Sequence, residues 1–177
     1  MSASPSSAAA MAEAGIGLGS NLGDRQAHLA GAARALAALE GTRILAASSV
    51  WQTPPVGPPG QPDYFNACLR IETDLTPKAL LAACLAIEQA HGRERRERWG
   101  ARTLDMDILW YDDLEMASEA LTLPHPRLIQ RAFVLAPLME IASDVRIAGD
   151  TVSAHFSRLD TEDLIRLGPF PRWDQPA

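Results

Sequence analysis

Apolar residues recur along the chain with two different spacings, and these spacings predict an alternation of strands and helices. Four apolar stretches have the length of a strand, at residues 15–19, 43–52, 64–73 and 104–111. Apolar side chains at helical spacing follow Asp24 and Thr76, and a third helix is predicted over Arg127–Ala136. The order of elements is therefore βαββαβ, with additional elements after Tyr111.

Capping residues mark the starts of the first two predicted helices. The Asp24 carboxylate can accept from free N–H groups of the first turn, and Thr76 with Pro77 forms an N-cap and a first helical position. The residues expected to face the core from these helices are Leu29, Ala32, Ala33, Leu36 and Leu39, then Leu80, Leu81, Cys84, Leu85 and Ile87. Between the second and third strands, residues 53–62 contain five prolines, which predicts a long loop.

This order predicts an α+β fold, in which helices pack on one face of an antiparallel, ferredoxin-like sheet. A chain of 177 residues with 47% hydrophobic composition is long enough for one well-buried core and short for two. Residues 1–13 are rich in Ser and Ala and have little to bury, so they are expected to form a flexible leader. We therefore predict one domain over residues 14–177, acting as a monomer.

Composition and charge argue against several classes of protein. No stretch approaches the roughly 20 apolar residues of a membrane helix, and no secretory signal is recognisable, so we expect a cytoplasmic protein without membrane contact. A net charge of −6 disfavours a general nucleic-acid binder. Cys68 and Cys84 lie in apolar stretches and are expected to be buried free thiols. The chain has no GxxxxGK[ST] phosphate loop, so an ATP site would be built differently.

Asp105 and Asp107 form the most informative pair in the sequence. Alternation along a strand places both carboxylates on one face, about 7 Å apart. At an effective dielectric near 20 they repel by roughly 2–3 kcal/mol, which favours a bound cation or a shared proton. Mg²⁺ prefers such hard oxygen ligands and completes its shell with water and substrate phosphates. The alternative is a polar strand face in water, with Leu104, Met106, Ile108 and Trp110 on the opposite face.

An arginine-rich segment precedes this pair. Five arginines fall within ten positions, namely Arg93, Arg95, Arg96, Arg98 and Arg102. Glycines bracket the segment, so it can bring guanidinium groups onto a polyphosphate at the metal site, and Trp99 can pack over a bound ring. His125 and Arg131 can add phosphate donors. The alternatives are a solvated face of Arg–Glu pairs and a structural histidine.

The segment around the proline-rich loop combines aromatic rings with an amide. Tyr64 and Phe65 are followed by Asn66 at the start of a predicted strand. Flat heteroaromatic ligands bind to rings that stack and to a few fixed donors and acceptors that recognise the ring edge. Alternation places Tyr64 and Asn66 on one face and Phe65 on the other, so at most two of the three share a pocket. Ordinary core packing is the alternative for both rings.

Several segments together resemble the 6-hydroxymethyl-7,8-dihydropterin pyrophosphokinase family. They are residues 17–24 (GLGSNLGD), 53–57 (TPPVG), 61–66 (QPDYFN), 92–93 (GR), 98–100 (RWG), 102–108 (RTLDMDI) and 123–126 (LPHP). The resemblance runs in order from about residue 15 to about residue 145. Each motif is weak alone, and their joint order and spacing carry the resemblance.

The resemblance implies transfer of the terminal diphosphate of ATP to the hydroxymethyl oxygen of the pterin, giving AMP and a pterin diphosphate for folate biosynthesis. Two Mg²⁺ ions bound by Asp105 and Asp107 would bridge the ATP phosphates. The residues implied to contact ATP are Glu88, Arg93, Arg95, Trp99, Arg102, His125 and Arg131, and Arg93 and Arg95 are implied to be catalytic with the two aspartates. Those implied to bind the pterin are Thr53, Pro54, Val56, Tyr64, Asn66, Trp99 and Phe133. Arg96 stays open as the alternative to Arg95.

Two other functions would also use such a fold. A nucleotidyltransferase of the polymerase-palm type presents paired aspartates on a similar sheet, but it needs a basic nucleic-acid track. A non-catalytic module that binds a small regulatory ligand would explain the fold and core, but not an acid pair beside an arginine loop. Dependence of activity on Mg²⁺ and on Asp107 separates the enzyme from the binding module.

Overall fold

The computed structural model describes residues 10–55, 59–92 and 103–174. Its elements in chain order are β1 (Ala12–Ser20), α1 (Arg25–Ala37), β2 (Thr42–Ala47), β3 (Val50–Thr53), β4 (Tyr64–Thr73), α2 (Pro77–Ala90), β5 (Asp105–Tyr111), β6 (Met116–Ala117), β7 (Thr122–Leu123), the 3-10 turn η1 (Leu128–Gln130), α3 (Ala132–Ala142), β8 (Arg146–Ile147), β9 (Asp150–Thr151), α4 (Val152–Phe156) and β10 (Ile165–Gly168). Both predicted caps are confirmed, since the side chains of Asp24 and Thr76 accept from the backbone N–H groups three residues on.

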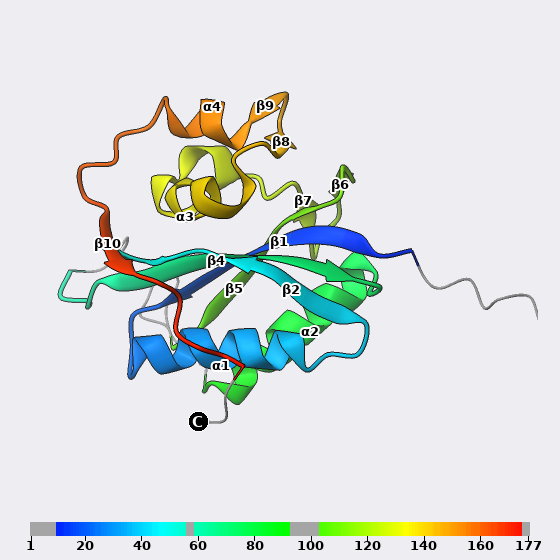
Figure 1. Cartoon of the computed structure of the whole chain (residues 1–177), viewed down its shortest axis with the longest axis horizontal. Coiled ribbons are helices and arrows are strands. Elements are labelled where there is room, and N and C mark those ends of the chain that lie inside the picture. The colour runs from blue at the N-terminus through cyan, green and yellow to red at the C-terminus, as the bar shows by residue number, and fades with distance from the viewer. Residues whose placement is uncertain (1–9, 56–58, 93–102, 175–177) are drawn as a thin grey trace, which may run out of the picture.

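One antiparallel sheet organises the described part of the chain. Its strand order is β10-β3-β4-β1-β5, and β2 pairs with β4 beside β3. Helices α1 and α2 cover one face of this sheet, while α3 and α4 cover the other (Figure 1). The expected α+β antiparallel sheet is confirmed. The expectation that helices cover one face is wrong, because α3 and α4, which follow Tyr111, cover the face that the first two helices leave exposed.

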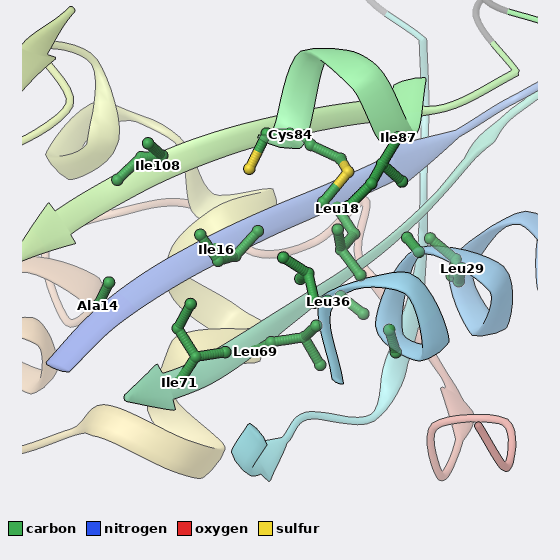
Figure 2. Packing of buried hydrophobic residues seen from close by; sticks show 14 of the residues in the cluster. Ala14, Ile16, Leu18, Leu29, Leu36, Leu69, Ile71, Cys84, Ile87 and Ile108 are labelled. Atoms are coloured by element: carbon green, nitrogen blue, oxygen red, sulfur yellow. The ribbon is translucent and has the colours of Figure 1, made fainter. Parts of the chain in front are cut away.

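The core between the sheet and the first two helices is built from alternate strand residues. Ile16 and Leu18 of β1 and Leu69 of β4 meet Leu29 and Leu36 of α1, and all are almost completely buried (Figure 2). Alternation along each strand places these side chains on the same face. The buried positions of α1 agree with the helical spacing in the sequence, whereas Leu85 of α2, expected in the core, is 40% exposed. Glu88 takes a buried position on α2 in its place.

A second core lies on the opposite face of the sheet. Leu128, Leu135 and Leu138 pack there against Cys68 of β4 and Leu109 of β5. The predicted third helix begins later than expected, because Arg131 has an extended backbone that separates η1 from α3. The helix also continues past residue 136. Burial of its side chains against the sheet outweighs the hydrogen bond that Pro137 removes from it.

The predicted strand 43–52 is in fact two strands. Ala47 of β2 pairs with Leu69, and Trp51 of β3 pairs with Asn66, so three residues between Ala47 and Trp51 face two residues of β4. This extra residue is a β-bulge, which bends the strand and redirects a backbone N–H. Local apolar character does not reveal such a bulge, because it depends on the pairing with β4.

A second bulge corrects the expected direction of Trp110. Ile16 pairs with Ile108 and Gly15 pairs with Trp110, so Leu109 is the extra residue of β5. Leu109 and Trp110 therefore both belong to the second core, whereas simple alternation places Trp110 with Ile108. The ring of Trp110 lies over Gly15, and a Cβ at that glycine would meet the ring.

Strand β1 starts at Ala12, earlier than the expected Gly15. Ala12 and Glu13, assigned to the leader from composition, pair with Thr73 and Glu72 of β4. The carboxylate of Glu13 also accepts from Arg70 at 2.9 Å. The pairing with β4 gives these residues the contacts that their composition does not suggest.

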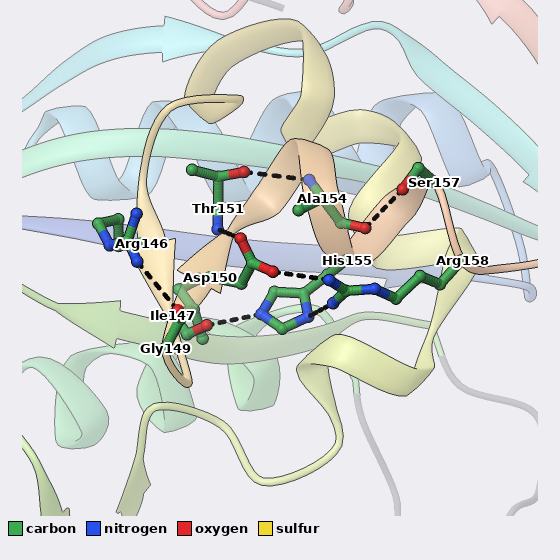
Figure 3. Close-up of polar contacts among 9 residues, drawn as sticks. All are labelled: Arg146, Ile147, Gly149, Asp150, Thr151, Ala154, His155, Ser157 and Arg158. Atoms are coloured by element: carbon green, nitrogen blue, oxygen red, sulfur yellow. Dashed lines mark hydrogen bonds and ion pairs between the residues drawn. The ribbon is translucent and has the colours of Figure 1, made fainter.

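The sequence leaves the residues after 145 without a role, and the structure shows that residues 146–158 form a hydrogen-bonded unit over α3 (Figure 3), while β10 joins the edge of the main sheet beside β3. The Nε2–H of His155 donates to the carbonyl of Ile147 at 2.6 Å, and Arg158 donates to Asp150 at 2.7 Å. The hydrogen bond from Arg158 lowers the pKa of the Asp150 carboxyl. Thr151 caps the short helix α4.

Within the described ranges, no helix has the length and apolar character that crossing a bilayer requires.

Candidate active site

The glycine floor of the candidate site consists of Gly17 and Gly19 of β1, on the face of the sheet that α3 covers. Gly19 pairs with Asn66 of β4 on one side and with Asp105 of β5 on the other. Directly opposed residues in antiparallel strands point to the same face, so the two side chains flank a position that has no side chain. A Cβ on Gly19 would lie 3.0 Å from Asn66 Oδ1 and 3.5 Å from the ring of Tyr64. In the next row Gly17 lies between Cys68 and Asp107, and the side chain of Leu109 packs over it, 3.3 Å from the position of a Cβ.

Three of the predicted pterin-binding residues meet on one side of this floor. The side-chain amide of Asn66 donates to the hydroxyl of Thr53 at 2.6 Å, and both side chains are buried. Thr53 pairs with Tyr64 across β3 and β4. Tyr64 and Asn66 point to the same face, as alternation predicted, and Phe65 packs against the core on the other face. Pro54 follows directly and is exposed.

Buried hydrogen bonds fix the chain just before Tyr64. The side-chain amide of Asn21 donates to Gln61 and to the Pro62 carbonyl, each at 3.2 Å. Arg25 donates to the Asp63 carbonyl at 2.8 Å, and its guanidinium lies 3.9 Å from the ring centre of Phe65. These contacts join the end of β1 and the start of α1 to the start of β4. They hold the aromatic side of the site against the glycine floor.

The opposite side of the floor carries the two carboxylates. Asp105 and Asp107 of β5 pair with Gly19 and Gly17, so both face the same side as Asn66. Among the described residues, no group of three or more His, Cys, Asp or Glu side chains could hold a metal ion. In phosphate-transfer sites Mg²⁺ usually binds only one or two protein carboxylates and completes its shell with water and substrate phosphates. The oxygen donors fit that ion.

Glu88 approaches the same strand from behind. It is 2% exposed on α2, and its Oε2 accepts from the backbone N–H of Met106 at 3.1 Å. That N–H lies between Asp105 and Asp107 in the chain. Glu88, expected near ATP, thus holds the backbone of β5 from the face opposite the carboxylates.

His125, Arg131 and Phe133 complete the described part of the site. The backbone N–H of His125 donates to the Leu109 carbonyl at 2.8 Å, which places the histidine beside β5. Burial, and then the positive charges of Arg131 and Arg127, lower the pKa of His125, while Asp105 opposes the shift. Arg131 stands at the N-terminus of α3, 5.6 Å from the ring centre of Phe133, where the helix dipole favours anions.

Neutral His125 makes stability depend on pH. The Arg127 N–H donates to His125 Nδ1, so Nε2 carries the proton of the neutral ring. Because the folded-state pKa lies below the ordinary 6.5, the unfolded chain binds the proton first on acidification, and the free energy of unfolding falls as pH drops through and below 6.5. His125→Gln should remove this share of the decline, measured by urea unfolding between pH 7.5 and 5.5. If the wild-type and variant plots of unfolding free energy against pH are parallel, this prediction is contradicted. His91 contributes separately in both proteins, because burial and the neighbouring His28 also lower its pKa.

Several predicted site residues lie outside the described residues, namely Val56, Arg93, Arg95, Arg96, Trp99 and Arg102. No role was predicted from the sequence for the glycines of β1. A signal was present, because Gly15, Gly17 and Gly19 occupy every second position of one strand. Trp110 and Leu109 pack over the first two, and Asn66 and Tyr64 lie beside the third. No comparable signal in the sequence indicates the contact of Glu88 with β5.

Residues 15–143 match the family model for 7,8-dihydro-6-hydroxymethylpterin-pyrophosphokinase (HPPK). A relative from Methylorubrum extorquens named 2-amino-4-hydroxy-6-hydroxymethyldihydropteridine pyrophosphokinase is 47% identical over 157 residues, covering 89% of this chain and 99% of the relative. The protein of the same name from Haemophilus influenzae is 41% identical over 160 residues, covering 90% of this chain and 100% of the relative.

Solved structures share the fold. The Plasmodium falciparum HPPK-DHPS structure with pterin and p-hydroxybenzoate aligns with a TM-score of 0.67 and 14% identity, covering 89% of this chain and 45% of that chain. The HPPK-DHPS A437G structure with pteroate aligns with a TM-score of 0.68 and 11% identity, covering 91% of this chain and 47% of that chain. This chain spans less than half of those longer chains, and at such identity the likeness concerns the fold alone.

Proposed function

The chain belongs to the 7,8-dihydro-6-hydroxymethylpterin-pyrophosphokinase family, and on that premise we propose how its residues carry out the family reaction. The protein is a pyrophosphokinase of folate biosynthesis. It transfers diphosphate from ATP to the hydroxymethyl group of 6-hydroxymethyl-7,8-dihydropterin. The hydroxymethyl oxygen forms a bond to the β-phosphorus, the bond from that phosphorus to the oxygen of the α-phosphate breaks, AMP leaves and the hydroxyl proton is released.

The carboxylates of Asp105 and Asp107 are proposed to hold two Mg²⁺ ions. When bound, Mg²⁺ neutralises phosphate charge and orients the reacting groups. Arg131 and the protonated Nε2 of neutral His125 are proposed to donate to the phosphate oxygens, together with Arg93 and Arg95 or Arg96, Arg102 and Trp99 from the arginine-rich segment. Donors that are fixed before the reaction stabilise developing charge without reorganisation.

The pterin is proposed to lie between Tyr64 and Phe133, with its edge read by Asn66 and the backbone at Thr53, Pro54 and Val56. Support comes from Gly19, which has no side chain and lies between Asn66 on the aromatic side of the site and Asp105 on the other side. A flat ring on the aromatic side would direct a substituent across the glycine towards the carboxylates. This juxtaposition across Gly19 is the observation that carries the assignment of the substrate sides.

The direct test is a coupled assay that follows AMP release from ATP and Mg²⁺ with and without 6-hydroxymethyl-7,8-dihydropterin. AMP should appear only when the pterin is present, and a chelator should abolish it. Folded protein that releases no AMP would overturn the proposal and favour a ligand-binding module.

The proposal also covers the topology of the sheet, the site of action and the oligomeric state. The order β3-β4-β1-β5 is compatible with the ferredoxin-like arrangement expected for the first six elements. ATP as co-substrate favours a cytoplasmic site of action. A monomer remains the prediction, and sedimentation of the purified protein over a range of concentrations would test it.

A further inference from the structure

A carboxylate outside the proposed substrate contacts joins α3 to the strand that ends in Thr53. Glu140 of α3 accepts from the Ser49 backbone N–H at 3.2 Å, from the Ser49 hydroxyl at 2.7 Å and from the Trp51 indole N–H at 2.8 Å. The guanidinium of Arg166 on β10 lies 3.7 Å from the same carboxylate. The four partner groups are all donors, so this position requires an acceptor with two oxygens.

The bulge between β2 and β3 makes this contact possible. Ser48 keeps the ladder with β4, since its N–H donates to the Cys68 carbonyl and its hydroxyl accepts from the Cys68 N–H. Ser49 is then the extra residue, and its N–H is available to Glu140. The bulge thus allows a direct hydrogen bond between α3 and the beginning of β3.

Strand β3 connects the contact with Glu140 to the pterin side of the site. Trp51 pairs directly with Asn66, and both side chains lie on the face that α3 covers. Thr53 follows two residues later on the same face and accepts from Asn66. Strand β3 pairs with β4 on one side and with β10 on the other, and Glu140 adds a contact to it from the layer of α3.

We propose that Glu140 is a positioning residue for pterin binding, which acts through Ser49 and Trp51 on the pair Thr53 and Asn66. It does not touch the substrate. The inference rests on the proposed function, because it assigns the pterin edge to the end of β3. It predicts a selective effect on one substrate, which a general loosening of α3 would not give.

Arg70 provides a matched control for such loosening. It donates to the Ile141 carbonyl at 3.1 Å and so anchors the same helix one residue further along. Its remaining contacts are with Glu13 and Asp144, away from β3. Glu119, an exposed residue, controls for the change of a glutamate to a glutamine itself.

The test compares steady-state kinetics of Glu140→Gln, Arg70→Gln and Glu119→Gln with wild type, varying each substrate at saturation of the other. In Glu140→Gln we expect the KM for the pterin to rise about tenfold, with the KM for ATP and kcat within about threefold, since the amide NH₂ would oppose a donor. Trp51→Phe should reproduce part of the increase. Direct titration of the pterin, followed by its fluorescence, should show the same loss of affinity.

The outcomes distinguish the possibilities. The positioning role would be overturned if the KM for the pterin were unchanged in Glu140→Gln, or if it rose equally in Arg70→Gln. Turnover by the wild type would still establish the reaction in that case. Absence of pterin-dependent AMP from the wild type would instead refute the proposed function. Thermal unfolding of each variant verifies that the comparison is made on folded protein.

Discussion

Replacing Asp107 by asparagine should lower kcat/KM by about 10³-fold or more. The variant keeps the shape of the side chain and removes the charge that is proposed to hold a divalent cation beside β5. Loss of one preorganised electrostatic contact in a site of this kind costs about 10²–10³-fold, and a metal ligand is expected to reach or exceed the upper value. The measurement is the coupled AMP assay at saturating Mg²⁺, together with Mg²⁺-dependent binding of ATP.

Asp113→Asn is the matched control, because Asp113 is exposed in the turn directly after β5. Its activity should equal that of wild type. An Asp107→Asn variant with wild-type turnover would refute the metal assignment, while normal thermal unfolding of that variant would exclude loss of the fold as the cause of a low rate.

The largest effect on stability is expected for Trp110→Ala. The indole is 3% exposed and packs in the second core, so its removal should reduce the free energy of unfolding by about 3–5 kcal/mol. Much of that value reflects the cavity left between β1 and the elements after Tyr111. Urea unfolding followed by circular dichroism measures the change.

A double-mutant cycle with Gly15 tests the packing that the bulge creates. A Cβ on Gly15 would meet the Trp110 ring, so Gly15→Ala should cost about 1–3 kcal/mol in the wild type. In a Trp110→Leu background the ring is absent and the cost should become much smaller. Equal costs in the two backgrounds would show that the tryptophan does not occupy the space over Gly15.

Local sequence signals predicted much of the fold. The caps at Asp24 and Thr76, the strand at residues 64–73 and the buried stripe of α1 follow from short-range chemistry that depends on near neighbours. Errors arose where pairing with a distant strand determines the result. The bulge at Ser49 and the bulge at Leu109 each depend on the register with another strand.

The candidate site divides in the same way. Alternation alone placed Asp105 with Asp107 and Tyr64 with Asn66, because the two-residue period of a strand needs no tertiary information. The sequence could not reveal that Asn66 and Asp105 face each other across Gly19, since three strands must pair in one register to bring them together.

The sequence by itself determined most elements up to Tyr111 and their order, the paired carboxylates and the resemblance to one family. Only the tertiary structure decided where the elements meet: the glycine floor, the support of β5 by Glu88, and the hold of Glu140 on β3. The reason is physical. Periodicity and capping are properties of neighbouring residues, whereas strand register and contacts between layers are selected by the packing of the whole sheet between its two layers of helices.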